Sequence, residues 1–526
     1  MKRVAIVVAM TVLVVAVYVL RLDDVAGLYK DDAYYMVLAK SLALGDGYAL
    51  ISSATTPIMP AFPPGFPLLL APVFAVAPQY PGNLFWLKLI SIASMIGAGA
   101  LTYRYFAGDR EIARGKAATI ALLTVLTPGF VFLATSTVMA ECVFTLALIG
   151  SAVTIERVAR RESRFAIVAA ALTTTAAWLI RSAGIALVGG GALFIWYRRG
   201  WRAAAGFVAV CAISYAPWAA YSFAHGPTAA ESAAHGGAAV YSYAQLLQTQ
   251  QGGDVSSSRV GLGEVPLRVL KNVVNVFGHD LGAVILPAGY RDAAESGLEV
   301  FMLSGETGMN AGSMGLGTPV VVLSIVVSLV MILGALVMAR QRIGVAEVFC
   351  VFTVGMVLLL PGRTYRYVLP IAPLLIGYFL IGVEATAVRF RSGTGSSAFR
   401  IAAACLLSLL AVEHGRYLWA KVNGPAPPWI QDGREVQGVT DFMNQRVPAA
   451  GSAVSTNPAL LYLLTGHKAV AYVDPYENWE RWQASGIRYA VALHVVPKPN
   501  RRFQYQVLYE SPRLRLWVLE LASAQP

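Results

Sequence analysis

The chain carries little charge for its length. Only 13% of its 526 residues are Asp, Glu, Lys or Arg, whereas a soluble domain carries about a quarter. Hydrophobic residues make up 57% of the sequence, and the mean hydropathy is +0.59. The apolar residues lie in blocks long enough to cross about 30 Å of hydrocarbon. This composition excludes an ordinary soluble enzyme and indicates an integral membrane protein.

Cysteine and histidine are also scarce. The four cysteines, Cys142, Cys211, Cys350 and Cys405, all lie in apolar runs and form no C-x-x-C pair, so we interpret them as small core residues. The six histidines are scattered. The sequence contains no G-x-x-x-x-G-K-[ST], H-E-x-x-H or G-x-S-x-G motif, which argues against phosphate-binding loops, zinc proteases and serine hydrolases. We therefore expect no cofactor; no ligand set indicates a divalent metal, which stays open as the alternative. No nucleic-acid motif is present.

The apolar runs predict an all-α polytopic membrane protein with about eleven transmembrane helices. The runs are Val4–Leu20, Leu84–Tyr105, Ala117–Ala134, Val138–Ile155, Phe165–Ile180, Ala183–Tyr197, Ala203–Phe223, Pro319–Ala339, Val345–Leu360, Tyr367–Val388 and Phe399–Val412. Arg21-Leu22-Asp23-Asp24, with no small-residue cleavage site, follows the first run. We therefore interpret that run as an uncleaved helix and not as a signal peptide.

The positions of the basic residues predict the orientation. Lys and Arg gather in every second short loop: at 2–3, 104–116, 157–164, 198–202, 340–342 and 389–400. Basic residues accumulate in cytosolic loops, so the N-terminus is predicted to be cytoplasmic. The compact loops favour the plasma (inner) membrane, with the endoplasmic reticulum as the alternative. The net charge of +12 then reflects topology. Loops 21–83 and 224–317 and the tail from His414 are predicted to lie outside.

The outer segments have different characters. In loop 21–83, Ala33–Leu44 and Phe66–Ala77 are apolar but too short to span, so we expect two interfacial helices. Loop 224–317 has no clear periodicity, which is typical of a functional or mobile segment. We divide the chain into a transmembrane domain, residues 1–413, and an extracytoplasmic α/β domain, residues 414–526.

The tail has the signals of a small α/β domain. Asn457 as N-cap, Pro458 at the first position and Gly466 at the end predict a short helix. Short runs of residues favoured in strands surround this helix. They are Lys468–Val473, Tyr489–Val496, Tyr505–Tyr509 and Leu514–Leu521.

Carboxylates stand at two points on the predicted outer face. Asp31 and Asp32 begin the first interfacial helix, where they serve either as caps favoured by the helix dipole or in chemistry. Glu141 lies near the outer end of the fourth predicted span, with apolar neighbours in sequence. An ionisable residue at such depth is a functional candidate; the alternative is that it reaches the outer surface.

Four cations lie on the outer side against the positional rule: Lys88, Arg181, Arg363 and Arg366. Such cations usually hold an anion, and Arg is suited to bidentate contact with phosphate. The alternative is that they pair with the acidic outer loops. We predict that these four residues bind a phosphate.

Several motifs together resemble the GT-C fold glycosyltransferases, and among these the group that uses polyprenyl-phosphate sugars and contains protein O-mannosyltransferases and lipid A aminoarabinose transferase. The motifs cover residues 1 to about 390. They are Asp31-Asp32-Ala33-Tyr34-Tyr35 followed by Ala39–Leu42 and Gly45–Tyr48, then Pro63–Pro72, Met139-Ala140-Glu141, Arg181, and Arg366–Pro373.

The resemblance implies roles for these residues. Asp31 would be the base that deprotonates an acceptor hydroxyl, and Asp32 and Glu141 would shape the site or orient the acceptor, although either adjacent carboxylate could be the base. Arg366 would hold the donor phosphate; Lys88 and Arg363 are added from topology and match no motif of the family. Tyr34, Tyr35 and Tyr367 are predicted to contact the acceptor or sugar.

The function that follows is an inverting glycosyl transfer, hexosyl or pentosyl, from a polyprenyl-phosphate donor to a hydroxyl of a glycan, lipid or protein at the outer face of the membrane. Two alternatives stand beside it. A transporter or flippase of lipid-linked substrates predicts charges at the bilayer midplane and inverted repeats. A non-catalytic scaffold keeps a fold without its activity.

Overall fold

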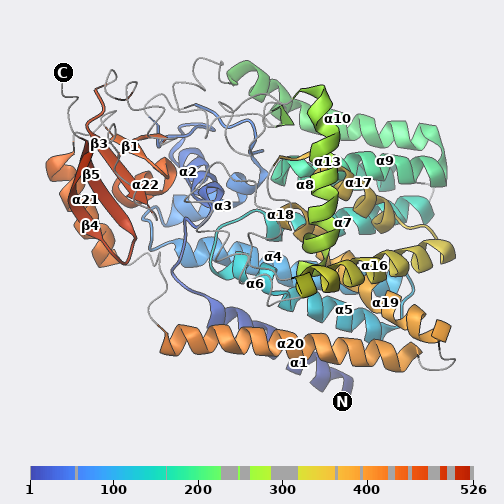
Figure 1. Cartoon of the computed structure of the whole chain (residues 1–526). Coiled ribbons are helices and arrows are strands. Elements are labelled where there is room, and N and C mark those ends of the chain that lie inside the picture. Colours follow the sequence, from blue (N-terminus) through green and yellow to red (C-terminus); the bar gives the residue numbers. More distant parts are fainter. Residues whose placement is uncertain are drawn as a thin grey trace.

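The computed structural model describes residues 2–53, 57–160, 163–226, 247–248, 261–285, 318–361, 365–390, 395–424, 433–447, 453–471, 482, 486–493 and 504–521. A large bundle of helices makes up most of the molecule. A small sheet with its own helices lies at one end of this bundle (Figure 1). All-α spans and a small α/β unit are therefore both present, as the sequence predicts.

Every predicted apolar run lies largely in helix. The long helices are α1 (Lys2–Arg21), α4 (Leu84–Arg104), α5 (Arg114–Leu126), α6 (Pro128–Thr135), α7 (Glu141–Arg160), α8 (Arg164–Ile180), α9 (Ile185–Arg199), α10 (Trp201–His225), α16 (Thr318–Gln341), α17 (Val345–Leu359), α19 (Ala372–Phe390) and α20 (Gly395–Asn423). Within the described residues, six helices are long and apolar enough to span a membrane, or seven if the bent pair α5 and α6 is one span. The chain is a multi-pass membrane protein; the count of about eleven stays a prediction.

Breaks in three helices place polar residues at one end of the bundle. Pro128 at the start of α6 interrupts the span that begins with α5, with a bend of 47°, because proline lacks the N–H that a continuous helix needs. The short helix η2 (Ser182–Gly184) separates α8 from α9. Helix α18 (Tyr365–Val368) and the turn η6 (Leu369–Ile371) precede α19. These breaks lie beside Glu141, Arg181 and Arg366.

The described part of loop 224–317 adds a helical segment to the bundle. It consists of η3 (Leu262–Glu264), α13 (Val265–Asn275), the π-helical turn η4 (Val276–Asp280) and α14 (Leu281–Ala283). Helix α13 packs against α17, and η4 packs against α16 and α18. A second π-helical turn, η1 (Tyr105–Asp109), continues α4.

The two predicted interfacial helices form but differ in their surroundings. In α3 (Gly65–Val76), Leu68, Leu69 and Val76 are exposed, as expected at a lipid interface. Helix α2 (Lys30–Leu44) is instead a core helix: it is buried without a break from Asp32 to Ala39 because α3 and the C-terminal helix α22 pack against it. The prediction of a surface helix was therefore wrong for α2, since an apolar helix can be covered by protein as well as by lipid.

The C-terminal unit is a five-stranded mixed sheet with the order β2-β1-β3-β5-β4. Its elements are α21 (Gly433–Arg446), β1 (Ala453–Ser455), α22 (Pro458–Thr465), β2 (Val470–Ala471), β3 (Tyr489–Leu493), β4 (Tyr505–Ser511) and β5 (Leu516–Leu521). Strand β1 runs parallel to β2 and β3, and β5 pairs antiparallel with β3 and β4. In α22 the Asn457 side chain accepts a hydrogen bond from the Leu460 amide at 3.1 Å, and Gly466 ends the helix with φ 76°. The predicted helix and strands are confirmed; β1 and α21 were not predicted.

The predicted boundary between residues 413 and 414 falls inside α20. His414 is buried there, and its Nε2 lies 2.9 Å from the Leu126 carbonyl oxygen of α5. Helix α20 continues to Asn423 and lies beside α1 (Figure 1). The membrane bundle thus extends by a continuous helix toward the C-terminal unit.

Candidate active site

Four charged side chains from distant parts of the sequence form a continuous ion-pair network. Arg366 Nη2 lies 2.5 Å from Asp31 Oδ2, and Arg366 Nε lies 3.4 Å from Glu141 Oε1. Arg181 contacts the same Glu141 oxygen. The residues lie on α2, on α7, before η2 and on α18. The fold therefore brings together Asp31, Glu141, Arg181 and Arg366, four of the residues that the sequence predicts for the site.

The network has an open end and a closed end. The side chains of Asp31 and Arg366 are 30% and 24% exposed, whereas those of Glu141 and Arg181 are 0% and 6% exposed. A buried carboxylate is tolerated only with compensating charge, and Glu141 has a guanidinium on either side. A ligand can therefore reach Asp31 and Arg366 directly, while Glu141 acts on it through the arginines.

The adjacent Asp32 has a different environment from Asp31. Its buried carboxylate accepts hydrogen bonds from the backbone amides of Gly27 at 2.8 Å and Ala33 at 2.9 Å. Burial raises the pKa of Asp32 to about 8, although both amide bonds favour the charged form. Asp32 thus holds the turn at Gly27 onto the start of α2. Asp31 presents the exposed carboxylate.

Gly27 joins this turn to the C-terminal unit. Its φ of 80° is in the left-handed region that favours glycine. A Cβ at this position would overlap the side chain of Leu460 on α22. The C-terminal unit therefore packs directly onto the turn that carries the amide partner of Asp32.

The predicted tyrosines occupy two different places. Tyr34 and Tyr35 are buried, and the Tyr35 ring packs edge-on against Phe62 and Phe66 with centroids 4.7 and 5.0 Å apart. Burial raises the pKa of the Tyr35 phenol, and the charges of all four network residues also act on it. The ring of Tyr367 lies 5.3 Å from the guanidinium carbon of Arg181. Tyr35 and Tyr367 thus lie next to the network.

Sequence reasoning missed two features of this region. The Tyr29 ring lies 4.9 Å from the guanidinium carbon of Arg366, at a position whose only signal is its place before Lys30-Asp31. The turn η4 brings a buried His279–Asp280 pair, 2.9 Å apart, toward α18. A lone His in a long loop has no sequence pattern that would indicate this placement.

Of the two cations added from topology, Lys88 lies apart from the network. Lys88 is fully buried, and its ammonium binds Asp23 and the Thr135 carbonyl oxygen. This geometry does not support phosphate binding by Lys88. Arg363 lies outside the described residues. Among the described residues, no group of three His, Cys, Asp or Glu side chains could hold a metal ion, and the expectation of no metal stays a prediction.

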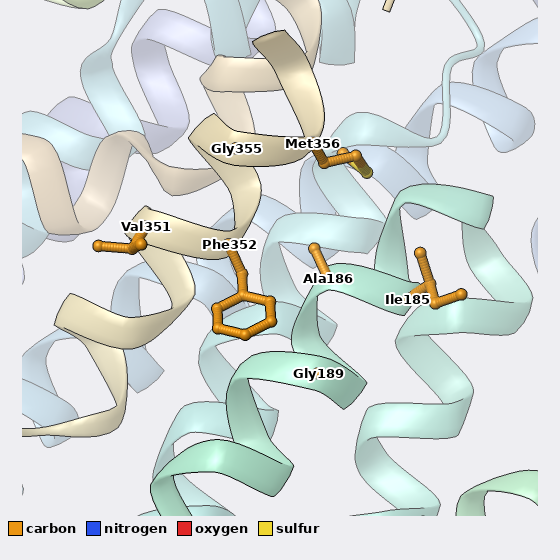
Figure 2. Close-up of a pocket in the computed structure, with 7 residues that line it drawn as sticks. All are labelled: Ile185, Ala186, Gly189, Val351, Phe352, Gly355 and Met356. Atoms are coloured by element: carbon orange, nitrogen blue, oxygen red, sulfur yellow. The ribbon is translucent and has the colours of Figure 1, made fainter. Parts of the chain in front are cut away.

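An apolar groove lies between α9 and α17. It has a volume of about 440 Å³ and is lined by Ile185, Ala186, Gly189, Val351, Phe352, Gly355 and Met356. Figure 2 shows the Phe352 ring between the two helices, near Gly189. Helix α9 begins shortly after Arg181, and α17 ends shortly before the segment that leads to Arg366. The groove therefore flanks the end of the bundle that carries the network.

Comparison with known proteins identifies the fold. Neither a family model nor a curated protein sequence matches the chain. The oligosaccharyltransferase from Archaeoglobus fulgidus, tethered with an acceptor peptide containing the NVT sequon, superposes with a TM-score of 0.55 and 14% identity over 92% of this chain and 69% of that chain. The chain has the GT-C fold.

Two further structures are similar. The same archaeal enzyme in complex with Zn and sulfate matches with a TM-score of 0.53 and 14% identity over 91% of this chain and 67% of that chain. ArnT from Cupriavidus metallidurans, bound to undecaprenyl phosphate, matches with a TM-score of 0.48 and 14% identity over 98% of both chains. At this identity the likeness concerns the GT-C fold alone.

Proposed function

We propose that the protein is an integral-membrane inverting glycosyltransferase that moves a sugar from a polyprenyl-phosphate donor to an acceptor hydroxyl. The observation that carries the proposal is the contact between Asp31 and Arg366 at the open end of the network. A general base needs an accessible carboxylate, and a phosphate leaving group needs fixed positive charge. One pair of neighbouring side chains supplies both, on a fold shared with an oligosaccharyltransferase.

The proposed reaction is a single displacement. Asp31 accepts the proton of the acceptor hydroxyl as its oxygen attacks the anomeric carbon from the face opposite the phosphate. The bond between the anomeric carbon and the phosphate oxygen breaks, and the electron pair leaves with the polyprenyl phosphate. Arg366 stabilises the charge on that phosphate, with Arg181 behind it. Attack from the opposite face inverts the anomeric configuration.

The resting ion pair supports this division of roles. Arg366 keeps Asp31 next to a positive charge, and the arriving phosphate competes for the same guanidinium. Once the phosphate takes up this contact, the Asp31 carboxylate is free to accept a proton from the acceptor. Glu141 limits how strongly Arg181 and Arg366 hold the phosphate, so that the polyprenyl phosphate product can leave.

The apolar groove supports a lipid-linked donor. The lining between α9 and α17 is almost wholly apolar, and both helices border the segments that carry Arg181 and Arg366. We propose that part of the isoprenoid chain lies there while its phosphate reaches Arg366. The positive-inside pattern supports a site at the outer face with the N-terminus in the cytoplasm.

Gly355 offers a clean test of the groove. A Cβ at Gly355 would meet no atom within 4 Å, so the side chain of Gly355→Leu begins in open space and adds bulk at the groove. We expect a higher KM for long-chain donors and little change for a donor with a short isoprenoid chain. Gly206 on α10 is equally open, and Gly206→Leu serves as the control. Equal KM values for the two variants would remove the groove from donor binding.

The function itself is tested by mass spectrometry of surface glycans and glycolipids. A deletion strain is complemented with wild type, Asp31→Asn or Asp24→Asn, where Asp24 is an exposed carboxylate in the same loop. We expect one sugar to disappear on deletion and to return with wild type and Asp24→Asn only. Asp31→Asn should lower transfer by about 10²–10⁴-fold, the usual contribution of a positioned base.

The alternatives predict other outcomes. If lipid-linked precursors accumulate and no glycan changes, the protein is a transporter. If wild type and both variants restore the profile, Asp31 is not the base. The sugar that disappears and the molecule from which it disappears identify the donor and the acceptor.

A further inference from the structure

A second cluster of buried charged residues centres on Lys88 of α4. Its Nζ donates to the Asp23 backbone oxygen at 2.6 Å, to Asp23 Oδ1 at 3.1 Å and to the Thr135 backbone oxygen at 2.7 Å. The Lys88 side chain is 0% exposed. An ammonium group has three N–H donors, and here each has an acceptor within the protein. Lys88 therefore has no donor left for a substrate phosphate.

The acceptors of this ammonium belong to the two segments that carry the site carboxylates. Asp23 lies between α1 and α2, shortly before Asp31. Thr135 ends α6, shortly before Glu141. The two segments also bond directly, since Ser136 Oγ donates to Asp23 Oδ2 at 2.6 Å. One buried cation thus ties together the chain segments that lead to the two anions of the network.

Helix α20 also binds the segment that contains Asp23. Tyr417 Oη donates to Asp23 Oδ2 at 3.0 Å, and Lys421 Nζ donates to the Leu22 backbone oxygen at 2.6 Å. The Asp23 carboxylate therefore accepts from Lys88, Ser136 and Tyr417. Ion pairs with such saturated hydrogen bonding and little exposure hold a defined geometry.

We infer that Lys88 is a positioning residue, which fixes the separation of Asp31 and Glu141 and thereby the place of Arg366 between them. This inference rests on the proposed function, because Asp31 and Arg366 must meet the acceptor and the phosphate at the same time. A displacement of about 1 Å in such a site is enough to slow a reaction about 10²-fold. Lys88 acts through Asp23 and Thr135 and touches no substrate.

The kinetic test compares Lys88→Met with Lys116→Met. Lys116 lies near the start of α5 and pairs with Glu384 at 2.5 Å, so its replacement removes the same charge far from the site. We expect Lys88→Met to lower the transfer rate at saturating donor by about 10–10²-fold while the Kd for undecaprenyl phosphate stays within about 2-fold of wild type. Lys116→Met should change neither. A Kd raised about 10-fold or more, with an unchanged rate at saturating donor, would show that Lys88 binds the phosphate.

A second measurement does not depend on activity. Hydrogen exchange in peptides that cover residues 20–32 and 133–142 should become faster in Lys88→Met and not in Lys116→Met. Unchanged exchange in both segments would overturn the inference. If wild type transfers no sugar, the proposed function fails, whereas this exchange result still decides whether Lys88 ties the two segments.

A milder variant covers the case in which Lys88→Met does not fold. Tyr417→Phe removes one donor from Asp23 and leaves Lys88 in place. A slower rate at saturating donor with an unchanged Kd for undecaprenyl phosphate supports positioning through Asp23. If neither quantity changes, the geometry of Asp23 does not matter to the site, and the inference is wrong.

Discussion

Replacing Glu141 by Gln changes the charge of the network without changing its shape. Glu141 is fully buried, lies 3.4 Å from Arg366 Nε and also contacts Arg181. Two unit charges at this distance interact by about 5 kcal/mol at an effective dielectric constant of about 20. Removing one partner of a buried pair typically destabilises a protein by about 3–5 kcal/mol. We therefore expect Glu141→Gln to lower thermal stability markedly in the absence of donor.

The same substitution should strengthen phosphate binding. In wild type, Glu141 competes with the substrate phosphate for the guanidiniums of Arg181 and Arg366. Without this competitor, we expect the Kd for undecaprenyl phosphate to fall about 10-fold, which corresponds to about 1.4 kcal/mol. Saturating undecaprenyl phosphate should then raise the thermal midpoint of Glu141→Gln more than that of wild type. Transfer should slow, because the product leaves less readily.

Glu156→Gln is the matched control for this experiment. Glu156 is also a buried glutamate with an arginine neighbour, 3.5 Å from Arg342 Nη2, and it accepts from the Val345 amide at 3.0 Å. Its replacement should destabilise the protein and leave the Kd for undecaprenyl phosphate unchanged. If Glu141→Gln binds undecaprenyl phosphate no more tightly than Glu156→Gln, then Arg181 and Arg366 do not hold the phosphate and the reasoning is refuted.

Two further predictions concern the turn before α2. Because burial raises the pKa of Asp32 from 3.8 to about 8, the folded state binds more protons than the unfolded chain between these values, and stability falls as pH rises through this window. Asp32→Asn should remove this loss of stability between pH 5 and pH 8, measured as thermal midpoints in detergent, and should retain transfer. If the midpoint of the variant falls with pH as steeply as that of wild type, the raised pKa of Asp32 is contradicted. Gly27→Ala should lower the free energy of unfolding by about 1–2 kcal/mol for its left-handed backbone, and further through the overlap with Leu460. Adding Leu460→Ala to this variant should therefore restore only part of the thermal midpoint. Full restoration would show that the backbone conformation carries no strain.

The sequence predicts the helical bundle well because a membrane span must be long and apolar whatever it packs against. It also predicts α22, since Asn457 and Gly466 are local signals at both ends of a short helix. Strand β1 was missed because three residues, Ala453–Ser455, are too few to show a period. Helix α2 was misplaced because an apolar stretch does not reveal whether lipid or α22 covers it.

The candidate site was predictable as a set of residues but not as a geometry. Glu141 stands out because it is an ionisable residue within an apolar run, and Arg366 because it is a cation against the positional rule. Asp31 stands out as a carboxylate at a helix start, and its motif strengthens the choice. Lys88 and Arg181 give the same sequence signal, a cation against the positional rule. Only the fold shows that Arg181 pairs with Glu141 while Lys88 binds Asp23 and a backbone oxygen, since the acceptors are distant in sequence.

The most direct test of single displacement at Asp31 is the anomeric configuration of the transferred sugar. Once the glycan lost on deletion is known, its linkage is determined by nuclear magnetic resonance and compared with the linkage of the sugar to phosphate in the donor. Direct attack by an acceptor hydroxyl, with Asp31 as base and Arg366 at the leaving phosphate, predicts the inverted configuration. A retained configuration would require a covalent or two-step route and would contradict the account.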